Sequence, residues 1–529
     1  MQVRTAIGQL APLTLLKGSI TLRIVRPAIA VFLSSLVLLS VPLLLGINAP
    51  PSVHDEFAFL LQADTFARGR LANPPHRHWE FFETMHVLQQ PTYAAKFPPG
   101  QGLAMAAGQK LGNPRYGVIL SVALACGATA WLAAGCLPPR WAKAAGLLAA
   151  THPLVFSWGQ SFWGGGMAML GGALTIGAML RLARRASWID GAVLGLGIAI
   201  LLNSRPFEGV LLLISAMVGL GWIARWRLGL VVRAPIVIPV LTILSATGAW
   251  MVLYNYRVTG HPLRLPDLEY TRQYMAAPRF WWMAANAQKT YRHPAMEAFH
   301  RGSEYQEYLR QTTIRGFLHA QWEKIAEIAR DWLLRPPMAS IVLLPALVLA
   351  LMRFRRGLWL ATTLGSVPVL EMLLTPWFRP HYLAVVVPCV FAAATIGFLV
   401  VHRARRRLGQ ILLLLLLIGQ LSGVGWIIRG MIIHPNVAGE PRARLLEQLN
   451  RSEGRHLVFV RYEGPKQTIV EWVYNSADID GQKVVLARDL GEKNAVLQNY
   501  YPDRAAWLLT VRGFAFEMVP LPGIGSTAQ

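Results

Sequence analysis

The stretch that decides the fold is PAIAVFLSSLVLLSVPLLLGINAPPSVHDE, residues 27–56. No charged residue occurs between Pro27 and Val53, and this run is longer than the roughly 20 apolar residues that a helix needs to cross a bilayer. Asp55 and Glu56 follow at once, where the helix should leave the membrane. Ionisable groups at the edge of the apolar layer usually mark a functional site. The stretch therefore predicts a membrane protein with an acidic site just outside its first span.

The composition indicates a polytopic membrane protein rather than a soluble enzyme. Hydrophobic residues make up 54% of the 529 residues and charged residues 15%, and the mean hydropathy is +0.39. The net charge of +24 comes from Lys and Arg clusters between apolar runs. Membrane orientation and anionic lipid explain such clusters better than nucleic acid does. Cys126, Cys136 and Cys389 fall inside apolar runs, which argues against a disulfide framework or a thiolate metal site.

Apolar runs occur throughout the first 430 residues and predict eleven spans, two of which are interrupted by Arg205 and Glu208. The predicted spans are 24–47, 115–137, 141–158, 163–182, 188–204, 207–223, 234–255, 337–352, 357–375, 381–401 and 409–430. The first run is too long for the apolar core of a signal peptide and lacks a small-residue cleavage site. We therefore expect it to remain as a span.

The charges of the connecting loops orient these spans. Each connection after an even-numbered span is basic, with clusters around residues 140–143, 181–185, 225–233, 353–356 and 403–407. The short connections on the other side contain only Arg205 and Arg379. By the positive-inside rule, the segment 1–23 is cytoplasmic. The C-terminus and the long loops 48–114 and 256–336 then lie outside.

Two helices are expected in the first outer loop, both lying along the membrane surface. For the first, Ser52 is a candidate cap and Asp55 follows three residues later, as in a capping box. Apolar residues then recur at helical spacing until Gly69. The second helix covers residues 103–111, and Pro99 suits its first turn.

The other polar segments are the second outer loop and the tail. The loop is rich in aromatic and basic residues between Tyr270 and His293, which suits a membrane interface and a sugar and phosphate site equally well. The tail, residues 436–529, predicts a small soluble α/β domain. Its expected helices are 442–451 and 467–474, and its expected strands are 456–462, 484–486 and 506–511. The polar segments 488–491 and 500–504 at strand ends suit a ligand site, although structural turns are the simpler explanation.

Over about residues 20–430 the chain resembles the GT-C glycosyltransferases. The resemblance rests on the Asp55–Glu56 pair directly after the first span, the interfacial helices in the same loop, the second large loop after span seven and the eleven spans. The closest pattern is that of the protein O-mannosyltransferase group and its bacterial relatives, which include the transferases that place aminoarabinose on lipid A.

The resemblance implies a mainly α, polytopic fold in the inner (plasma) membrane. It implies transfer of a sugar from a polyprenyl-phosphate donor to a lipid, glycan or protein acceptor on the extracytoplasmic face. The reaction would invert the anomeric carbon, commonly with no required metal or other cofactor. The tail is then expected to cap the catalytic face or to select acceptors.

The acidic pair supplies the candidate catalytic residues. Inverting transfer needs a carboxylate that takes the proton of the acceptor. Asp55 matches the first acid of the family motif and is the candidate base, whereas Glu56 matches the second and would position the acceptor or the base. Alternatively, both acids only stabilise a helix N-terminus, by about 0.3–1 kcal/mol.

Cations are needed to hold the lipid phosphate as it leaves. The candidates on predicted outer connections are Lys96, Arg205, Arg379 and His381. The alternative for the two arginines is ion pairing within the protein, Arg205 with Glu208 and Arg379 with Glu371.

Four further residues are candidates for the lining of the site: His54, Glu83, His86 and Glu371. Solvation alone would also explain the three in the first loop. The spacing of His and Cys residues indicates no metal site.

Two other classes of membrane protein remain open. A flippase or transporter of lipid-linked glycans would also be polytopic, but charged residues at the midplane or repeated halves are not evident. An O-antigen ligase or an oligosaccharyltransferase is a nearer alternative. The Trp-Trp-Asp motif typical of oligosaccharyltransferases is absent, because Met283 follows Trp281 and Trp282.

Overall fold

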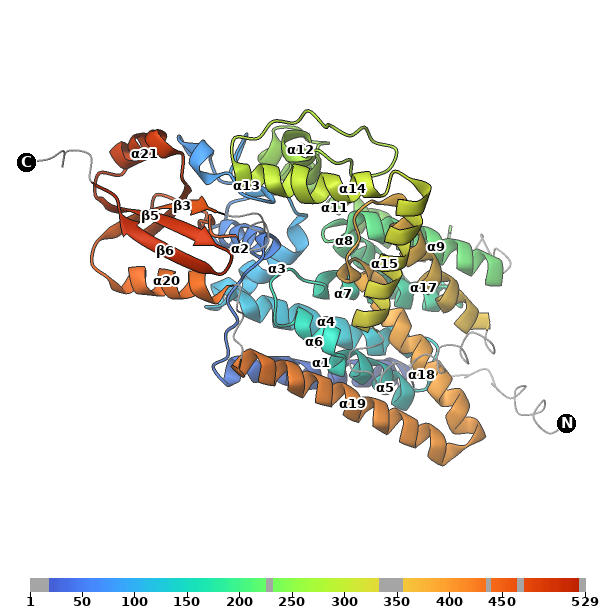
Figure 1. Cartoon of the computed structure of the whole chain (residues 1–529). Coiled ribbons are helices and arrows are strands. Elements are labelled where there is room, and N and C mark those ends of the chain that lie inside the picture. The colour runs from blue at the N-terminus through green and yellow to red at the C-terminus, as the bar shows by residue number, and fades with distance from the viewer. Residues whose placement is uncertain (1–18, 225–231, 333–354, 434–438, 464–470, 523–529) are drawn as a thin grey trace, which may run out of the picture.

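A computed structural model describes residues 19–224, 232–332, 355–433, 439–463 and 471–522. A bundle of apolar helices forms one part of the molecule, and a small α/β domain lies at its C-terminal end (Figure 1). Two long loops of the bundle lie next to this domain (Figure 1).

Five helical segments of the described chain are long and apolar enough to cross a membrane. They are α1 (Ser19–Leu44), α4 (Pro114–Ala133), α11 (Ala234–Thr259), the continuous pair η3 (Pro380–Val386) and α18 (Val387–Ala404), and α19 (Arg406–Ile433). Four more apolar helices complete the bundle: α7 (Gly166–Leu182), α8 (Trp188–Leu202), α9 (Pro206–Ala224) and α17 (Arg355–Leu374). Each of these helices overlaps a predicted span.

The predicted span 141–158 is wrong as a single helix. The chain forms α5 (Pro139–Thr151) and α6 (Pro153–Trp158), which are separated at His152. Pro153 disfavours helical geometry at the residue before it, and the His152 side chain caps the new helix by accepting from the Leu154 N–H. The predicted span 337–352 lies outside the described residues.

Small residues allow the helices of the bundle to pack closely, as is common in membranes. A side chain at Gly127 of α4 would lie 3.0 Å from the Ala28 carbonyl oxygen of α1. A side chain at Gly172 of α7 would lie 2.0 Å from the Val385 carbonyl oxygen of η3. These glycines thus set the position of α1, which leads to the first loop, and of η3.

The first loop contains two helices that pack on each other, α2 (His54–Ala67) and α3 (Pro99–Lys110), and α3 packs on α4. Pro99 occupies the first position of α3, as predicted. Between the helices lie the short elements η1 (Trp79–Phe82), β1 (Val87–Leu88) and β2 (Ala94–Ala95).

The predicted cap of α2 is wrong by one residue. The helix begins at His54 with Val53 as its N-cap, which has no side-chain acceptor. Glu56 is therefore the third helical residue, and its carboxylate accepts from the backbone N–H groups of Ser52 (3.0 Å) and Val53 (3.5 Å). This shift leaves the Asp55 carboxylate outside the cap.

The second loop packs over the first. It contains α12 (Pro266–Tyr274), α13 (Pro294–Glu297), the π-helical turn η2 (Ala298–Glu304), α14 (Tyr305–Arg310) and α15 (Ile314–Trp332). Tyr270, Tyr274 and Met296 share a buried cluster with Met85 and Leu88 of the first loop.

The C-terminal domain is a four-stranded sheet with helices, in the strand order β4-β3-β5-β6. Its elements are α20 (Glu440–Arg451), β3 (Arg455–Tyr462), β4 (Val484–Arg488), η4 (Gly491–Lys493), α21 (Asn494–Tyr500), β5 (Arg504–Arg512) and β6 (Ala515–Pro520). β3 runs parallel to β4 and β5, whereas β6 is antiparallel to β5. The three predicted strands are confirmed, and β6 was not predicted.

The predicted helix 467–474 is wrong in its described part. Residues 471–474 are not helical, because the Glu471 carboxylate bonds locally to the Val473 N–H (2.7 Å) in place of a helical carbonyl. Residues 464–470 lie outside the described chain.

The C-terminal domain and the first loop share one hydrophobic core. Phe81, Phe82 and Tyr93 of the loop are buried in the same cluster as Leu457 and Phe459 of β3. The domain is therefore packed directly on the loop that carries the acidic pair.

Candidate active site

Asp55 lies in the first turn of α2 between two histidine rings. Its Oδ2 atom is 3.4 Å from His54 Nε2 and 3.8 Å from His86 Nε2, and 31% of the side chain is exposed. The two rings meet edge to face at 4.5 Å, and Phe299 of η2 packs against both. Asp55 is thus held in place but still open to a reactant.

Burial disfavours the charged form of both histidines. Burial lowers the pKa of His54 and lowers the pKa of His86 well below its usual range. In the described residues, the Nδ1 atoms of both rings are buried without a hydrogen-bond partner. His54, Asp55 and His86 offer three ligand atoms within 4.8 Å of one another. Two neutral imidazoles and a carboxylate are a donor set that suits a divalent ion such as zinc, so the three residues fit a metal.

Glu56 points away from this cluster. Besides Ser52 and Val53, its carboxylate accepts from the Phe162 N–H at 3.1 Å. Burial raises the pKa of Glu56, and these backbone bonds act against that rise. Because three N–H groups occupy its oxygens, Glu56 joins the start of α2 to the turn before α7. The geometry favours the helix-capping alternative for this residue.

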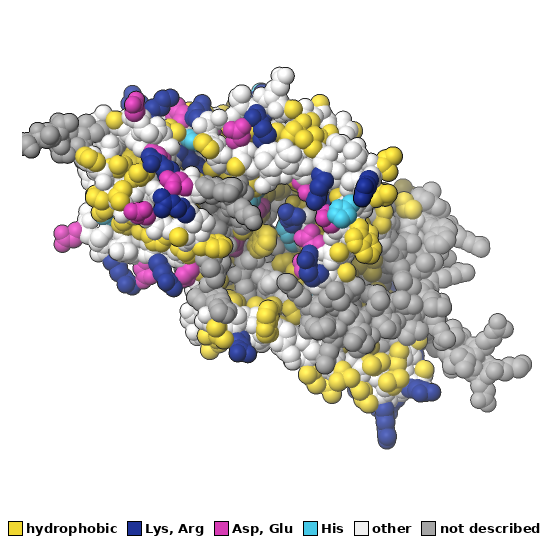
Figure 2. Space-filling model, in the orientation of Figure 1, with side chains coloured by type: hydrophobic (Ala, Val, Ile, Leu, Met, Phe, Trp, Pro, Cys, Tyr) yellow, Lys and Arg dark blue, Asp and Glu magenta, His cyan; other side chains and the backbone are white. Residues whose placement is uncertain are grey.

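Lys96 is a buried cation on which the charge of Asp55 acts. Its ammonium is buried over the Tyr270 ring (4.8 Å to the centroid) and is 3.9 Å from Asp267 Oδ1. Burial lowers the Lys96 pKa to about 8, and the charges of Glu304, Arg279, Asp55 and Arg205 also act on it. Figure 2 shows a recess in the middle of one face in which basic, acidic and histidine side chains gather.

The Arg205 guanidinium stacks on Tyr382 (4.5 Å) and approaches Glu208 Oε1 at 3.5 Å, so the ion pair considered as the alternative is present. The charges of Arg205, Asp55 and Arg379 all act on Tyr382. Tyr382 therefore lies among these three charged residues, which come from three separate parts of the chain.

Arg379 donates to the neighbouring Phe378 carbonyl oxygen (3.1 Å), and it forms no ion pair with Glu371 within the described chain. His381 packs between Trp163 (5.1 Å) and Tyr382 (4.8 Å). Glu371 of α17 is buried near the charges of Glu208 and Arg205, and its Oε2 atom has no hydrogen-bond partner among the described residues.

In the described part of the chain, the Glu83 carboxylate bonds to residues of the second loop and not to the Asp55 cluster. It accepts from Tyr274 and Arg292, both at 3.2 Å, and pairs with His293 Nε2 at 3.1 Å. It borders a cavity of about 450 Å³ that is also lined by Trp79, Tyr274 and Arg292. The first loop thus separates this polar cavity from the Asp55 cluster.

Several residues near the site escaped the prediction from sequence. Arg279 is ion-paired with Asp267, the acid that also approaches Lys96, and Phe299 packs on both histidines. Glu471 and Arg488 of the C-terminal domain bond to the first loop. Of these residues, only Arg488 had a signal in the sequence, because it is a polar residue at the end of a predicted strand.

No family model and no curated relative matches this chain. Among solved structures, ArnT from Cupriavidus metallidurans in the apo state matches with a TM-score of 0.56 at 14% identity, over 93% of this chain and 97% of ArnT. ArnT bound to undecaprenyl phosphate also has a TM-score of 0.56, at 15% identity over 94% of this chain and 98% of ArnT. An oligosaccharyltransferase from Archaeoglobus fulgidus, in complex with zinc and sulfate, has a TM-score of 0.48 at 11% identity, over 91% of this chain and 67% of its own.

At these identities the similarity to ArnT establishes the fold. It extends over 93% of this chain and 97% of ArnT. With the apolar helices of the bundle, this similarity identifies the protein as a multi-pass integral membrane protein with the fold of ArnT.

Proposed function

We propose that the protein transfers a sugar from a polyprenyl-phosphate donor to an acceptor, with Asp55 as the general base. The observation that carries the proposal is the cluster around Asp55. The partly exposed Asp55 carboxylate acts electrostatically on the buried Lys96 ammonium, and the charge of Arg205 acts on the same ammonium. Inverting transfer from a lipid phosphate needs an acid residue and cations in one site.

In the proposed reaction, Asp55 accepts the proton of the acceptor hydroxyl as that oxygen bonds to the anomeric carbon. The bond from the anomeric carbon to the phosphate oxygen breaks on the opposite face of the sugar, and the phosphate keeps the electron pair. Lys96, Arg205 and Arg279 would offset its growing negative charge. General-base catalysis of this kind contributes a factor of about 10²–10⁴.

The donor class is supported by the ArnT structure that binds undecaprenyl phosphate. Arg379 and His381 also border Tyr382, and we propose that they help to hold the lipid phosphate at the membrane side of the site. Tyr382 lies in η3, at the start of an apolar segment that could span the membrane. A phosphate at this level would leave the polyprenyl tail among the apolar helices.

We further propose that the protein lies in the inner membrane with the Asp55 cluster on the extracytoplasmic face. The loop charges support this orientation. A divalent ion at His54, Asp55 and His86 would supply Lewis-acid chemistry, but its positive charge would make the Asp55 carboxylate a weaker base. We therefore propose that transfer requires no metal.

The test is a transfer assay with the purified full-length protein in lipid nanodiscs and a panel of polyprenyl-phosphate sugars. Asp55→Asn should lower turnover by about 10²–10⁴-fold with the donor that the wild type consumes. Glu80→Gln is the matched control, because Glu80 is an acid of the same loop outside the cluster. Full activity of Asp55→Asn would refute the base assignment. A wild type that consumes no donor would refute the enzyme itself and favour a flippase.

A further inference from the structure

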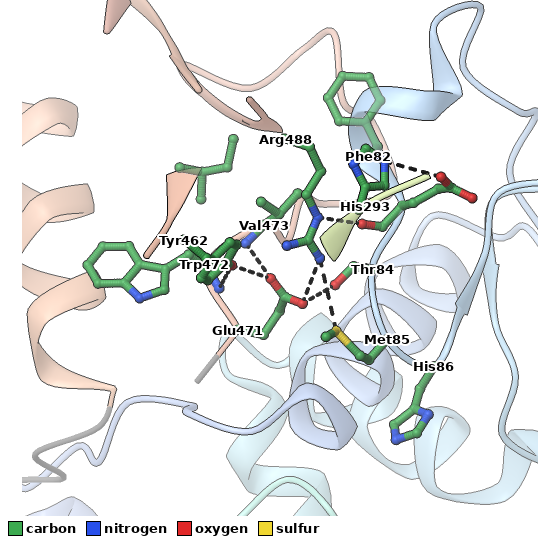
Figure 3. Close-up of polar contacts among 12 residues, drawn as sticks. Phe82, Thr84, Met85, His86, His293, Tyr462, Glu471, Trp472, Val473 and Arg488 are labelled. Atoms are coloured by element: carbon green, nitrogen blue, oxygen red, sulfur yellow. Dashed lines mark hydrogen bonds and ion pairs between the residues drawn. The ribbon is translucent and has the colours of Figure 1, made fainter. Parts of the chain in front are cut away.

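Glu471 and Arg488 form a buried ion pair on the side of the C-terminal domain that faces the first loop. Arg488 Nη2 is 3.1 Å from Glu471 Oε2, and each side chain is only 3% exposed. Arg488 is the last residue of β4. Figure 3 shows the pair between the C-terminal domain and the residues Thr84, Met85 and His86.

The pair bonds to the first loop as well as to its own domain. Arg488 Nε donates to the Glu83 carbonyl oxygen at 2.8 Å, and Thr84 Oγ1 donates to Glu471 Oε2 at 2.5 Å (Figure 3). Tyr462 Oη holds Glu471 from the other side at 2.8 Å. Replacing a buried ion pair by apolar residues is often neutral for stability. Stability alone therefore does not explain this ion pair. Its distinctive feature is that it bonds to the first loop.

The loop segment held in this way leads directly to His86. Two residues after Thr84, His86 has a backbone φ of +64°, in the left-handed region that residues other than glycine rarely adopt. Its N–H donates to Tyr270 Oη (2.9 Å), and its carbonyl oxygen accepts from the Lys96 N–H (3.0 Å). A strained conformation persists only where the surroundings determine it, and the bonds at Glu83 and Thr84 are part of those surroundings.

Residues 471–474 of the C-terminal domain also contact the chain next to Asp55. The Glu471 N–H donates to the Ser52 carbonyl oxygen at 3.4 Å, just before α2. The Tyr474 ring packs against Phe57 of α2 in a tilted arrangement, with 4.9 Å between the ring centroids. Residues 471–474 therefore touch both walls of the cluster, the start of α2 that carries Asp55 and the segment that carries His86.

We infer that Arg488 and Glu471 are positioning residues that set the distance between His86 and Asp55, so that the C-terminal domain completes the active site. The present distance is 3.8 Å, which is slightly too long for a hydrogen bond. A shift of less than about 1 Å in the segment 83–86 would make or break that bond. The inference rests on the proposed role of Asp55.

The first test is Arg488→Met in the full-length protein in nanodiscs, assayed with the donor that the wild type consumes. We expect turnover to fall about 10- to 100-fold, the range that a misplacement of about 1 Å can cause, with little change in the KM for the donor. Arg504→Met is the matched control. Arg504 is another buried arginine of the domain, but it donates to the carbonyl oxygens of His456, Lys483 and Asp480 and not to the first loop.

A double-mutant cycle separates positioning from a general loss of stability. If Arg488 acts through His86, the combined variant His86→Ala/Arg488→Met should be no slower than His86→Ala alone. Thr84→Val, which removes one hydroxyl, should lower turnover in the same direction but less. If Arg488→Met does not fold, Thr84→Val still tests the inference.

Hydrogen exchange gives a readout that does not depend on activity. In Arg488→Met, the amides of residues 84–86 should exchange faster than in the wild type and in Arg504→Met. Unchanged exchange, wild-type turnover of both Arg488→Met and Thr84→Val, or equal losses in the two arginine variants would overturn the inference. If Asp55→Asn stays active, the proposed function fails instead, whatever the arginine variants do.

Discussion

The two adjacent acids have different surroundings, because consecutive side chains of a helix point in directions about 100° apart. Asp55 points to the two histidines, whereas Glu56 accepts three backbone N–H groups. The difference follows from the start of α2 at His54, one residue away from the register that the sequence suggests. A pair that looks like one motif is therefore one candidate base and one helix cap.

Lys96 should make donor binding sensitive to alkaline pH. Burial lowers its pKa to about 8, so the ammonium is charged below that pH and loses its charge as the pH rises through 8. The KM for the donor should rise about tenfold between pH 7 and pH 9, as the charged fraction falls. Lys96→Arg should remove this rise because a guanidinium stays charged. The same pH dependence in that variant would exclude Lys96 as the phosphate ligand.

Zinc should inhibit transfer rather than support it. The positive charge of a zinc ion held by His54, Asp55 and His86 would make the Asp55 carboxylate a weaker base for the proton of the acceptor. EDTA should therefore leave turnover unchanged, micromolar zinc should lower it, and His86→Ala should weaken the inhibition. Steady-state rates with EDTA and with added zinc test this expectation. Loss of activity in EDTA with recovery in Mg²⁺ or Mn²⁺ would instead show a required metal.

At the scale of elements, the apolar helices were largely predictable, and the failures have local causes. Length and hydrophobicity are properties of the chain itself, so the runs of α1, α4 and α19 were recognised. The break at His152 follows from Pro153, and the irregular segment 471–474 follows from a side chain that bonds to its own backbone. Such local effects of single residues override a helical pattern.

Glu56→Gln should affect the stability of α2 more than catalysis. Both Glu56 oxygens accept backbone N–H groups, whereas an amide has only one acceptor oxygen. The loss of the bonds to the other oxygen should cost about 1–3 kcal/mol of unfolding free energy. Thermal unfolding in detergent should show a lower Tm, while turnover per folded molecule should remain far above that of Asp55→Asn. Normal stability with an inactive site would instead assign Glu56 to the reaction.

At the scale of the whole molecule, the C-terminal domain and the second loop enclose the loop that carries Asp55. Phe81 and Phe82 of that loop are buried with Phe459 of β3, and Tyr270 of the second loop is buried with Leu88. The basic connections between the spans predict how this assembly is oriented in the membrane.

Cysteine labelling tests that orientation. Asp503 lies in the C-terminal domain with 54% of its side chain exposed, and Arg405 is exposed in the basic connection before α19. A maleimide that does not cross membranes should label Asp503→Cys in intact spheroplasts and Arg405→Cys only after lysis. Labelling in the opposite order would place the Asp55 cluster on the cytoplasmic face. The parent protein, with its three native cysteines, gives the background.

The sequence by itself determined the membrane class and the helical runs, and it supplied the predicted orientation and the proposed role of Asp55. These follow from apolar length and from charge asymmetry, which are properties of neighbouring residues. Only the tertiary structure brought Asp55 together with His86, placed Lys96 under the charges of both Asp55 and Arg205, and joined Arg488 to the first loop. These residues are far apart in the chain, and their contacts depend on how two loops and a separate domain pack.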